Sequence, residues 1–170
     1  RIETLTPTIR GIWLKLDRPL HFQAGQYLNL EVAAVDSQSR AFSLANAPQQ
    51  ADVVELNVRI VPGGQVTTWL HEKLEVGEKL KFSGPYGRFF VKKSANVPLI
   101  FMAGGSGLSS PKSMIEDLLN NGCELPMTLV YGQRNQQELY YHDEFTALAA
   151  KHSNFSYVPA LSHETEDSSW

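Results

Sequence analysis

The sequence predicts a small antiparallel β-barrel followed by an α/β unit with a parallel sheet, and two observations carry this prediction. From Thr8 to Phe90 the apolar residues form short runs that alternate with polar residues, which is the period of half-buried strands. After Lys92 the order becomes apolar strand, glycine turn and helix, and then strand, helix and strand again. This second order is typical of βαβ units, whose strands form a parallel sheet.

The barrel prediction covers residues 1–94. Its clearest strand is 54–60, where apolar residues alternate with Glu55, Asn57 and Arg59. Further strands are expected at 12–16, 27–32, 40–44, 79–83 and 88–91, with glycine- or proline-containing turns between several of them. A short helix is expected at 68–73. About six short antiparallel strands are typical of a small barrel.

The α/β prediction covers residues 95–170, with the boundary in the polar segment 93–96. Ser110 is the expected cap of the first helix, Pro111 its first residue, and Gly122 its C-terminal stop. The expected strands are 98–102, 127–131 and 155–160, and the expected helices are 111–120 and 143–151.

Composition excludes several classes of function. The formal charge of −3, without a long basic run, gives no electrostatic reason to expect a nucleic-acid or acidic-membrane partner. The longest apolar run, 97–103, is far shorter than the roughly 20 residues that span a bilayer. A single cysteine, Cys123, forbids an internal disulfide and a four-thiolate iron–sulfur cluster held by this chain alone, and fits a cytoplasmic location. The histidines show no ligand spacing, so no metal site is expected.

Two groups of residues in the barrel suit a flavin dinucleotide. Arg40, Ala41, Phe42 and Ser43 place a guanidinium, an aromatic ring and a hydroxyl on one strand, where they can bind phosphate and lie against an isoalloxazine. The alternative is a surface arginine beside a core phenylalanine. The turn at 62–67 leads into a short helix whose amides can bind an anion, and the alternative there is a glycine turn with a threonine cap.

Two groups in the α/β unit suit a second dinucleotide. The run Gly104, Gly105, Ser106, Gly107 and Leu108 joins a strand to a helix, where small residues let a pyrophosphate approach backbone amides. The run lacks the third glycine of the G-x-G-x-x-G fingerprint, and a purely structural turn is the alternative. Gln133 and Arg134 follow the second parallel strand, where they can meet an adenosine ribose, or Arg134 can be a solvated loop residue.

Taken in order, four motifs resemble the ferredoxin-NADP reductase family over nearly the whole chain. The motifs are Arg-x-Phe-Ser, Gly-Gly-x-x-Thr, Gly-Pro-x-Gly at 84–87, and Gly-Gly-Ser-Gly-Leu. Within the family, the stretches 40–48, 131–134 and 140–144 are most similar to the reductase components of multicomponent phenol hydroxylases. The resemblance implies an FAD-binding barrel followed by an NAD-binding α/β domain.

The resemblance also implies roles for single residues. Arg40 would bind the FAD phosphates, Phe42 would lie against the flavin ring, and Ser43 would approach the reactive nitrogen as the catalytic residue. The remaining implied contacts are Asn57, Val58 and Arg59 at the flavin and ribityl chain; Gly64, Gln65, Val66 and Thr67 at the pyrophosphate; and Gly104 to Leu108 with Pro111 at the nicotinamide dinucleotide.

The implied activity is electron transfer. Hydride would pass from NADH, with NADPH as the alternative donor, to FAD, and single electrons would then pass through a [2Fe-2S] centre to the hydroxylase component of a phenol or other aromatic monooxygenase. The ferredoxin-type [2Fe-2S] domain is expected only in a full-length parent, outside this chain. The family's C-terminal Cys-Gly-Pro segment has no counterpart here, so we expect an α/β domain that is incomplete at its C-terminal end. The alternatives are a stand-alone flavin or cytochrome reductase and a non-catalytic FAD-binding module.

Overall fold

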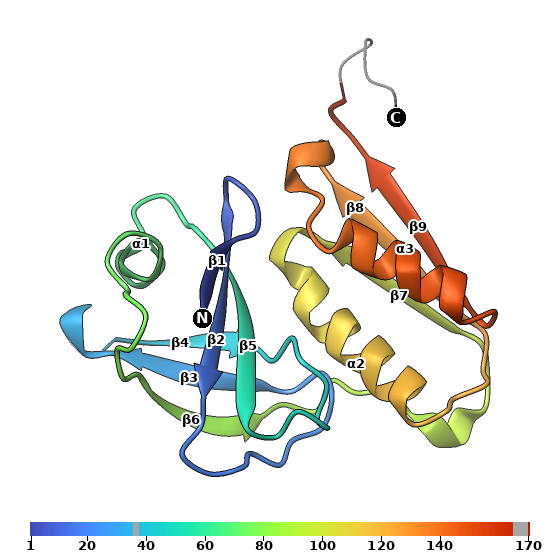
Figure 1. The fold of residues 1–170 in the computed structure, drawn as a ribbon, viewed down its shortest axis with the longest axis horizontal. Helices are drawn as coiled ribbons and strands as arrows, with labels where there is room; N and C mark the ends of the chain where they lie inside the picture. The colour runs from blue at the N-terminus through green and yellow to red at the C-terminus, as the bar shows by residue number, and fades with distance from the viewer. Residues whose placement is uncertain (36–37, 165–169) are drawn as a thin grey trace.

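The computed structural model describes residues 1–35, 38–164 and 170, which form two units side by side (Figure 1). The first unit contains antiparallel strands and a short helix, and the second contains a parallel sheet with helices packed on it. Within the described part of the chain, no helix is long and apolar enough to cross a membrane. The predicted succession of a barrel and an α/β unit is confirmed.

The barrel consists of two antiparallel sheets. One has the strand order β1-β2-β5 and the other has the order β4-β3-β6. The strands are β1 (Ile2–Thr4), β2 (Ile9–Lys15), β3 (Tyr27–Val32), β4 (Gln38–Ser43), β5 (Val53–Arg59) and β6 (Lys81–Tyr86). The helix α1 (Gln65–Glu72) lies between β5 and β6 in the sequence and closes one end of the barrel (Figure 1).

The core of the barrel follows the alternation of its strands. Leu28 and Leu30 of β3 are fully buried, as are Leu56 and Val58 of β5. Each such side chain contributes about 1.5–3 kcal/mol when it leaves water, so these alternating positions fix the register of both sheets. α1 adds Val66 and Leu70 to the same core.

One expected barrel strand is wrong. Residues 88–91 form no strand, and Phe89 is 67% exposed, because this segment leaves the barrel and has no partner strand. The sheet instead gains β1, whose three residues pair with β2 through Ile2 opposite Ile12. α1 also begins three residues before the expected position, at Gln65.

The second unit contains a parallel sheet of order β7-β8-β9. Phe101, Leu129 and Phe155 point from successive strands into one core, which α2 completes with Ile115 and Leu118. On the opposite face Ile100 and Met102 of β7 are exposed, so the described helices cover one face of the sheet. The elements are β7 (Leu99–Gly104), η3 (Gly105–Leu108), α2 (Ser109–Asn120), β8 (Met127–Gln133), η4 (Gln136–Glu138), α3 (His142–Lys151) and β9 (Phe155–Leu161).

The start of α2 differs from the expectation. The helix begins at Ser109, directly after η3, and Ser110 lies inside its first turn rather than at its cap. Pro111 is therefore the third helical residue, a position that is tolerated because the first turn has no internal partner for its N–H groups. The expected stop is confirmed, since Gly122 has φ 68° and its N–H donates to the carbonyl of Leu119.

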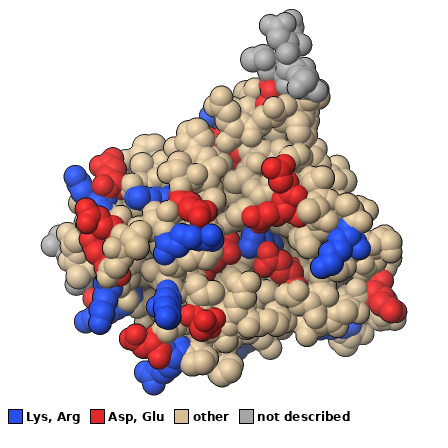
Figure 2. All heavy atoms as spheres, viewed as in Figure 1, with Lys and Arg blue, Asp and Glu red and all other residues tan. Residues whose placement is uncertain are grey.

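The two units meet through α2, which lies between the barrel and the parallel sheet (Figure 1). The interface is partly apolar, because Ile9 of β2 and Ala24 belong to the buried cluster of the second unit. On the face shown in Figure 2, acidic and basic side chains are interspersed. This face therefore offers no large field of a single sign.

Candidate functional site

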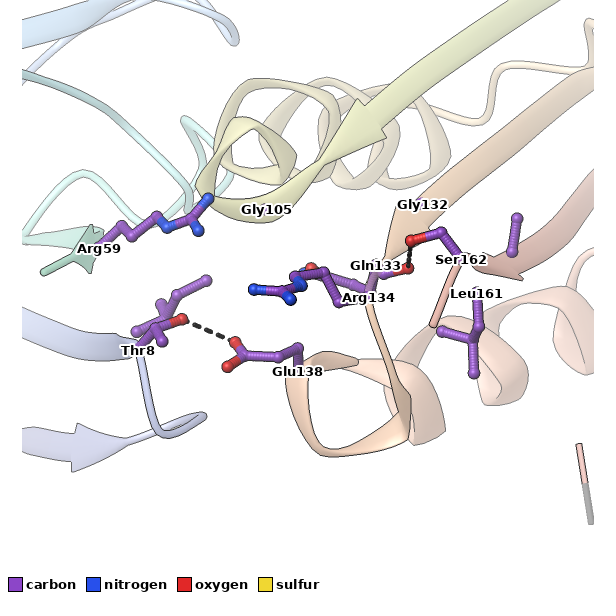
Figure 3. A pocket seen from close by; sticks show the side chains of 11 residues that line it. Thr8, Arg59, Gly105, Gly132, Gln133, Arg134, Glu138, Leu161 and Ser162 are labelled. Atoms are coloured by element: carbon purple, nitrogen blue, oxygen red, sulfur yellow. Dashed lines mark hydrogen bonds between the residues drawn. The ribbon is translucent and has the colours of Figure 1, made fainter. Parts of the chain in front are cut away.

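A cavity of about 380 Å³ opens at the carboxyl ends of the parallel strands, where open α/β sheets bind their ligands (Figure 3). We call it the strand-end cavity. The second unit contributes residues at and after the ends of β7, β8 and β9, and the first unit contributes the end of β5 and the start of β2 with the residue before it. It is lined by Thr8, Ile9, Arg59, Gly105, Gly132, Gln133, Arg134, Glu138, Ala160, Leu161 and Ser162.

The glycine run after β7 forms one wall of this cavity. Gly105 has φ 55°, and a Cβ atom there would lie 3.1 Å from Nη1 of Arg59. Gly104 pairs with Gly132 across the parallel strands, and a Cβ on Gly104 would lie 3.6 Å from the carbonyl oxygen of Gly132. The missing side chains therefore leave room beside a guanidinium, which is the type of cradle that a phosphate group fits.

The cavity contains two cations and one carboxylate. Arg59 and Arg134 extend into it from opposite sides (Figure 3). Glu138 lies between the units, and its Oε2 accepts hydrogen bonds from the hydroxyls of Thr6 at 2.8 Å and Thr8 at 2.7 Å. Two guanidinium groups suit a pyrophosphate, and a carboxylate can accept a hydrogen bond from a ribose hydroxyl.

The cavity joins only some of the expected dinucleotide residues. Arg59, Gly105, Gln133 and Arg134 line it, whereas Leu108 is fully buried in the core and Pro111 lies within α2. Gln133 donates from Nε2 to the hydroxyl of Tyr131 at 2.6 Å. The resemblance placed Arg59 beside the flavin, and the structure places it against the glycine loop.

Several residues of the cavity were not among the expected ones. Gly132 lies in the last two residues of β8, Ala160 and Leu161 end β9, and Ser162 follows β9 directly. The rule that identified the glycine run, namely the carboxyl end of a parallel strand, applies equally to these positions. Of the other unexpected lining residues, Thr8 and Ile9 come from the barrel, and Glu138 comes from η4 in the connection between β8 and α3.

The first expected flavin group lies on β4. Arg40 and Ala41 are exposed, and Arg40 donates from Nη1 to the carbonyl of Ser39 at 2.9 Å. Phe42 pairs with Leu28 and packs, half-buried, against the barrel core. Ser43 ends the strand opposite Tyr27 and is partly exposed. On β4 the polar side chains of Arg40 and Ser43 are therefore accessible on either side of the Phe42 ring.

The second expected flavin group surrounds the start of α1. Gly64 is the cap of the helix, and the Thr67 hydroxyl donates to its carbonyl oxygen at 3.2 Å while accepting from the N–H of Val61 at 3.1 Å. Gln65 is exposed, whereas Val66 is buried in the barrel core. The hydroxyl of Thr67 thus holds the turn together, and the exposed Gly63 and Gln65, with the half-buried Gly64 between them, are accessible to an anion.

The third expected flavin group, on β5, divides between two faces. Val58 is fully buried inside the barrel, whereas Asn57 and Arg59 point from the other face toward the second unit. Asn57 is only 5% exposed, and its Nδ2 has no hydrogen-bond partner among the described residues. A buried amide without a partner is costly, so it marks a place where another molecule can bind.

Within the described residues, no cluster of histidine, cysteine or acidic side chains could hold a metal ion. The site therefore offers cations, hydroxyls, amides and glycine backbone. Such groups are suited to binding and orienting a dinucleotide.

Comparison with known proteins agrees with this geometry. Residues 1–91 match the family model of the oxidoreductase FAD-binding domain, and residues 101–170 match the oxidoreductase NAD-binding domain. The reductase component of phenol 2-monooxygenase from Pseudomonas sp. (strain CF600) is 55% identical over 98% of this chain and 47% of its own length. A phenol hydroxylase protein of Acinetobacter pittii is 49% identical over 99% of this chain and 48% of its own length.

A solved structure supports the same relationship. The crystal structure of an Amycolatopsis cytochrome P450 reductase superposes with a TM-score of 0.91 at 32% sequence identity, and covers 98% of this chain and 51% of its own. The chain thus spans about half the length of the curated relatives it matches. The FAD-binding model alone covers more than half of the chain. The chain therefore belongs to the ferredoxin reductase family of FAD- and NAD-binding oxidoreductases.

Proposed function

We propose that this chain is the flavin- and nicotinamide-binding part of a reductase that takes hydride from NADH and passes electrons to an oxygenase. The strand-end cavity carries this proposal. It places Arg59 of the barrel beside Gly105 of the α/β unit, so a dinucleotide bound there would contact both units at once. Such a cavity brings a nucleotide from one domain to a flavin held by the other.

The residues present fit both cofactors. The amide of Asn57 lacks a partner, and the gap beside Gly105 is one that a Cβ would fill. We assign the FAD phosphates to Arg40 and to the turn at 64–67, and the nicotinamide dinucleotide to the strand-end cavity. Ser43, at the end of β4, is the proposed hydroxyl beside the reactive flavin atom.

The protein's own contribution is binding, orientation and exclusion of water. Arg59 and Arg134 neutralise a pyrophosphate, while the glycine backbone lets it approach closely. Thr6 and Thr8 hold Glu138 at the mouth of the cavity and so join the two units there. FAD, when bound, supplies the conversion of a two-electron donor into single-electron steps.

The proposed partners follow from the relatives. We propose a domain boundary near residue 94, a ferredoxin-type [2Fe-2S] domain outside this chain, and a phenol or other aromatic hydroxylase as the final acceptor. The single cysteine agrees with an iron–sulfur domain outside this chain, since a four-thiolate centre needs ligands from elsewhere. It also supports a cytoplasmic location, where thiols stay reduced.

Replacing Arg40 tests the flavin site. We expect Arg40→Ala to weaken FAD binding by roughly tenfold to a hundredfold, since a charge-assisted hydrogen bond contributes about 1.5–3 kcal/mol. Titration of the apoprotein with FAD, followed by flavin fluorescence, measures the dissociation constant. Arg18→Ala, which removes another exposed arginine of the barrel, is the control. Equal affinities in the two variants would remove Arg40 from the site.

The nicotinamide preference is a second test. We expect a higher specificity constant for NADH than for NADPH. The pyrophosphate common to both nucleotides would already neutralise Arg59 and Arg134, so the further negative charge of the 2′-phosphate would meet Glu138. Anaerobic reduction of the FAD-loaded chain with each nucleotide, followed by flavin absorbance, gives the comparison. Faster reduction by NADPH at equal low concentrations would contradict this expectation.

A further inference from the structure

A buried polar network connects the two units. It consists of Glu55 and Asn57 of β5, Lys112 and Glu116 of α2, and Tyr141, which precedes α3. Glu55 and Lys112 are 4% and 5% exposed. We call these five residues the interdomain network. None of its side chains lines the strand-end cavity.

Lys112 is the centre of the interdomain network. Its Nζ lies 3.1 Å from Oε2 of Glu55, 2.9 Å from Oε1 of Glu116 and 3.4 Å from the carbonyl oxygen of Ala45. Burial opposes the charge of Lys112, but the attraction of Glu55 and Glu116 outweighs it and raises the pKa of the ammonium. Each of its three N–H donors thus has an acceptor, and two of the acceptors belong to the barrel.

Tyr141 joins α3 to the interdomain network, and its backbone is strained. Its φ of 59° is in the left-handed region, which a residue with a large side chain rarely adopts. This conformation places the ring 4.9 Å from the Lys112 ammonium and lets the hydroxyl donate to Oε1 of Glu55 at 2.7 Å. Backbone strain of this kind persists only where surrounding contacts compensate for it, and here those contacts are the ones that Tyr141 makes between the two units.

The hydroxyl of Tyr141 also lies 3.2 Å from Oδ1 of Asn57. One proton cannot serve two acceptors fully, and rotating the amide would let Nδ2 donate to the hydroxyl oxygen instead. Either orientation leaves one polar atom of the buried Asn57 amide without a partner in the described residues. Apart from this one atom of Asn57, the hydrogen bonds and ion pairs described above hold the side chains of the interdomain network in one arrangement.

A buried ion pair contributes little net stability compared with an apolar pair of similar size, because desolvation offsets the attraction. Such a pair can instead fix one position of the two elements that carry it, here β5 and α2. Here β5 carries both Glu55 and Arg59, while α2 carries Lys112 and follows the glycine run directly. Fixing Lys112 on Glu55 therefore also fixes Gly105 against Arg59.

We propose that Glu55, Lys112 and Tyr141 are positioning residues that set the register of the α/β unit on the barrel, and thereby hold the nucleotide in line for hydride transfer. The effect on hydride transfer rests on the proposed function. The effect on domain register does not, and it can be measured without any cofactor.

The first experiment measures the register directly. Spin labels on Glu72→Cys in α1 and Lys151→Cys in α3, with Cys123→Ser, report the distance distribution between the units by pulsed electron resonance. Both labelled residues are exposed and lie on helices. We expect a single narrow distribution for the unaltered network and a broadened or shifted one for Tyr141→Phe and for the apolar double variant Glu55→Met with Lys112→Met.

The apolar double variant separates positioning from folding. It removes both charges of the buried pair, Tyr141 can still donate to Asn57, and the side chain of Glu116 is 23% exposed to water. We therefore expect its midpoint of urea unfolding to stay closer to that of the parent than the midpoint of Lys112→Met alone, which leaves Glu55 buried without a countercharge. The rate of flavin reduction at saturating NADH should nevertheless fall on the order of tenfold to a hundredfold. The dissociation constant of NADH should rise by a smaller factor than the rate falls, since every side chain that lines the cavity is kept.

The outcomes are distinct. A narrow, unshifted distance distribution in both variants would overturn the proposal, as would a wild-type reduction rate in the double variant. If NADH fails to reduce the FAD-loaded parent, the proposed function is wrong, and the spin-label distances still decide whether the interdomain network sets the register.

Discussion

Gly25→Ala is expected to lower the free energy of unfolding by about 3–5 kcal/mol, which combines backbone strain with overpacking. Gly25 has φ 99°, and a Cβ there would lie 2.0 Å from the carbonyl oxygen of Phe89 and 2.2 Å from Cε of Met114. Met114 belongs to α2, so the added methyl would push the segment that leaves the barrel and the helix of the second unit apart. Urea unfolding followed by tryptophan fluorescence measures the loss.

Gly77→Ala is the matched control for this experiment. Gly77 has φ 101°, almost the same backbone conformation, but a Cβ there would meet nothing within 4 Å. Only the strain remains, so we expect a loss of about 1–2 kcal/mol. Equal losses at the two glycines would show that the close packing of Gly25 between the units contributes nothing.

Arg59→Glu is expected to weaken NADH binding by more than roughly a hundredfold. The change removes a charge-assisted contact of about 1.5–3 kcal/mol and adds repulsion between a carboxylate and the pyrophosphate. Arg134 stays in the cavity, so some binding should persist. The dependence of the anaerobic flavin-reduction rate on NADH concentration gives the dissociation constant.

Two comparisons make the Arg59 experiment specific. Arg59→Lys keeps the charge and should lose less than about tenfold, because only the forked geometry is removed. FAD affinity should hardly change in Arg59→Glu, since the guanidinium lies against the glycine loop. A loss of FAD affinity as large as the loss of NADH affinity would instead support a role for Arg59 at the flavin.

Much of this fold can be predicted from local pattern. Strands such as β3 and β5 place apolar residues at every second position, and this alternation alone selects strands and the face that becomes the barrel core. The glycine run after β7 can be recognised in the same way, because a strand, small residues and a helix in that order place it at the ligand-binding edge of a parallel sheet.

The local sequence pattern does not predict a strand correctly where the strand depends on a neighbouring strand. Residues 88–91 contain Phe89 and Phe90, whose type favours a strand, but no strand lies beside them to accept their backbone hydrogen bonds. β1 is the reverse case, since three residues are too short to show a period, yet they pair with β2. Strand formation at the edge of a sheet is a property of both partners, and a local window contains only one of them.

The sequence by itself determined the order of the two units, the residues that form each core and the glycine loop, because these depend on local periodicity and on turn residues. Only the tertiary structure decided what the polar face of β5 does. There Glu55, Asn57 and Arg59 alternate with apolar residues as on a solvent-exposed strand face, but the first two are buried against α2 and Tyr141, and Arg59 reaches Gly105. The physical reason is that a polar side chain is buried when a distant segment supplies its hydrogen-bond and charge partners, and those partners lie more than fifty residues away in the chain.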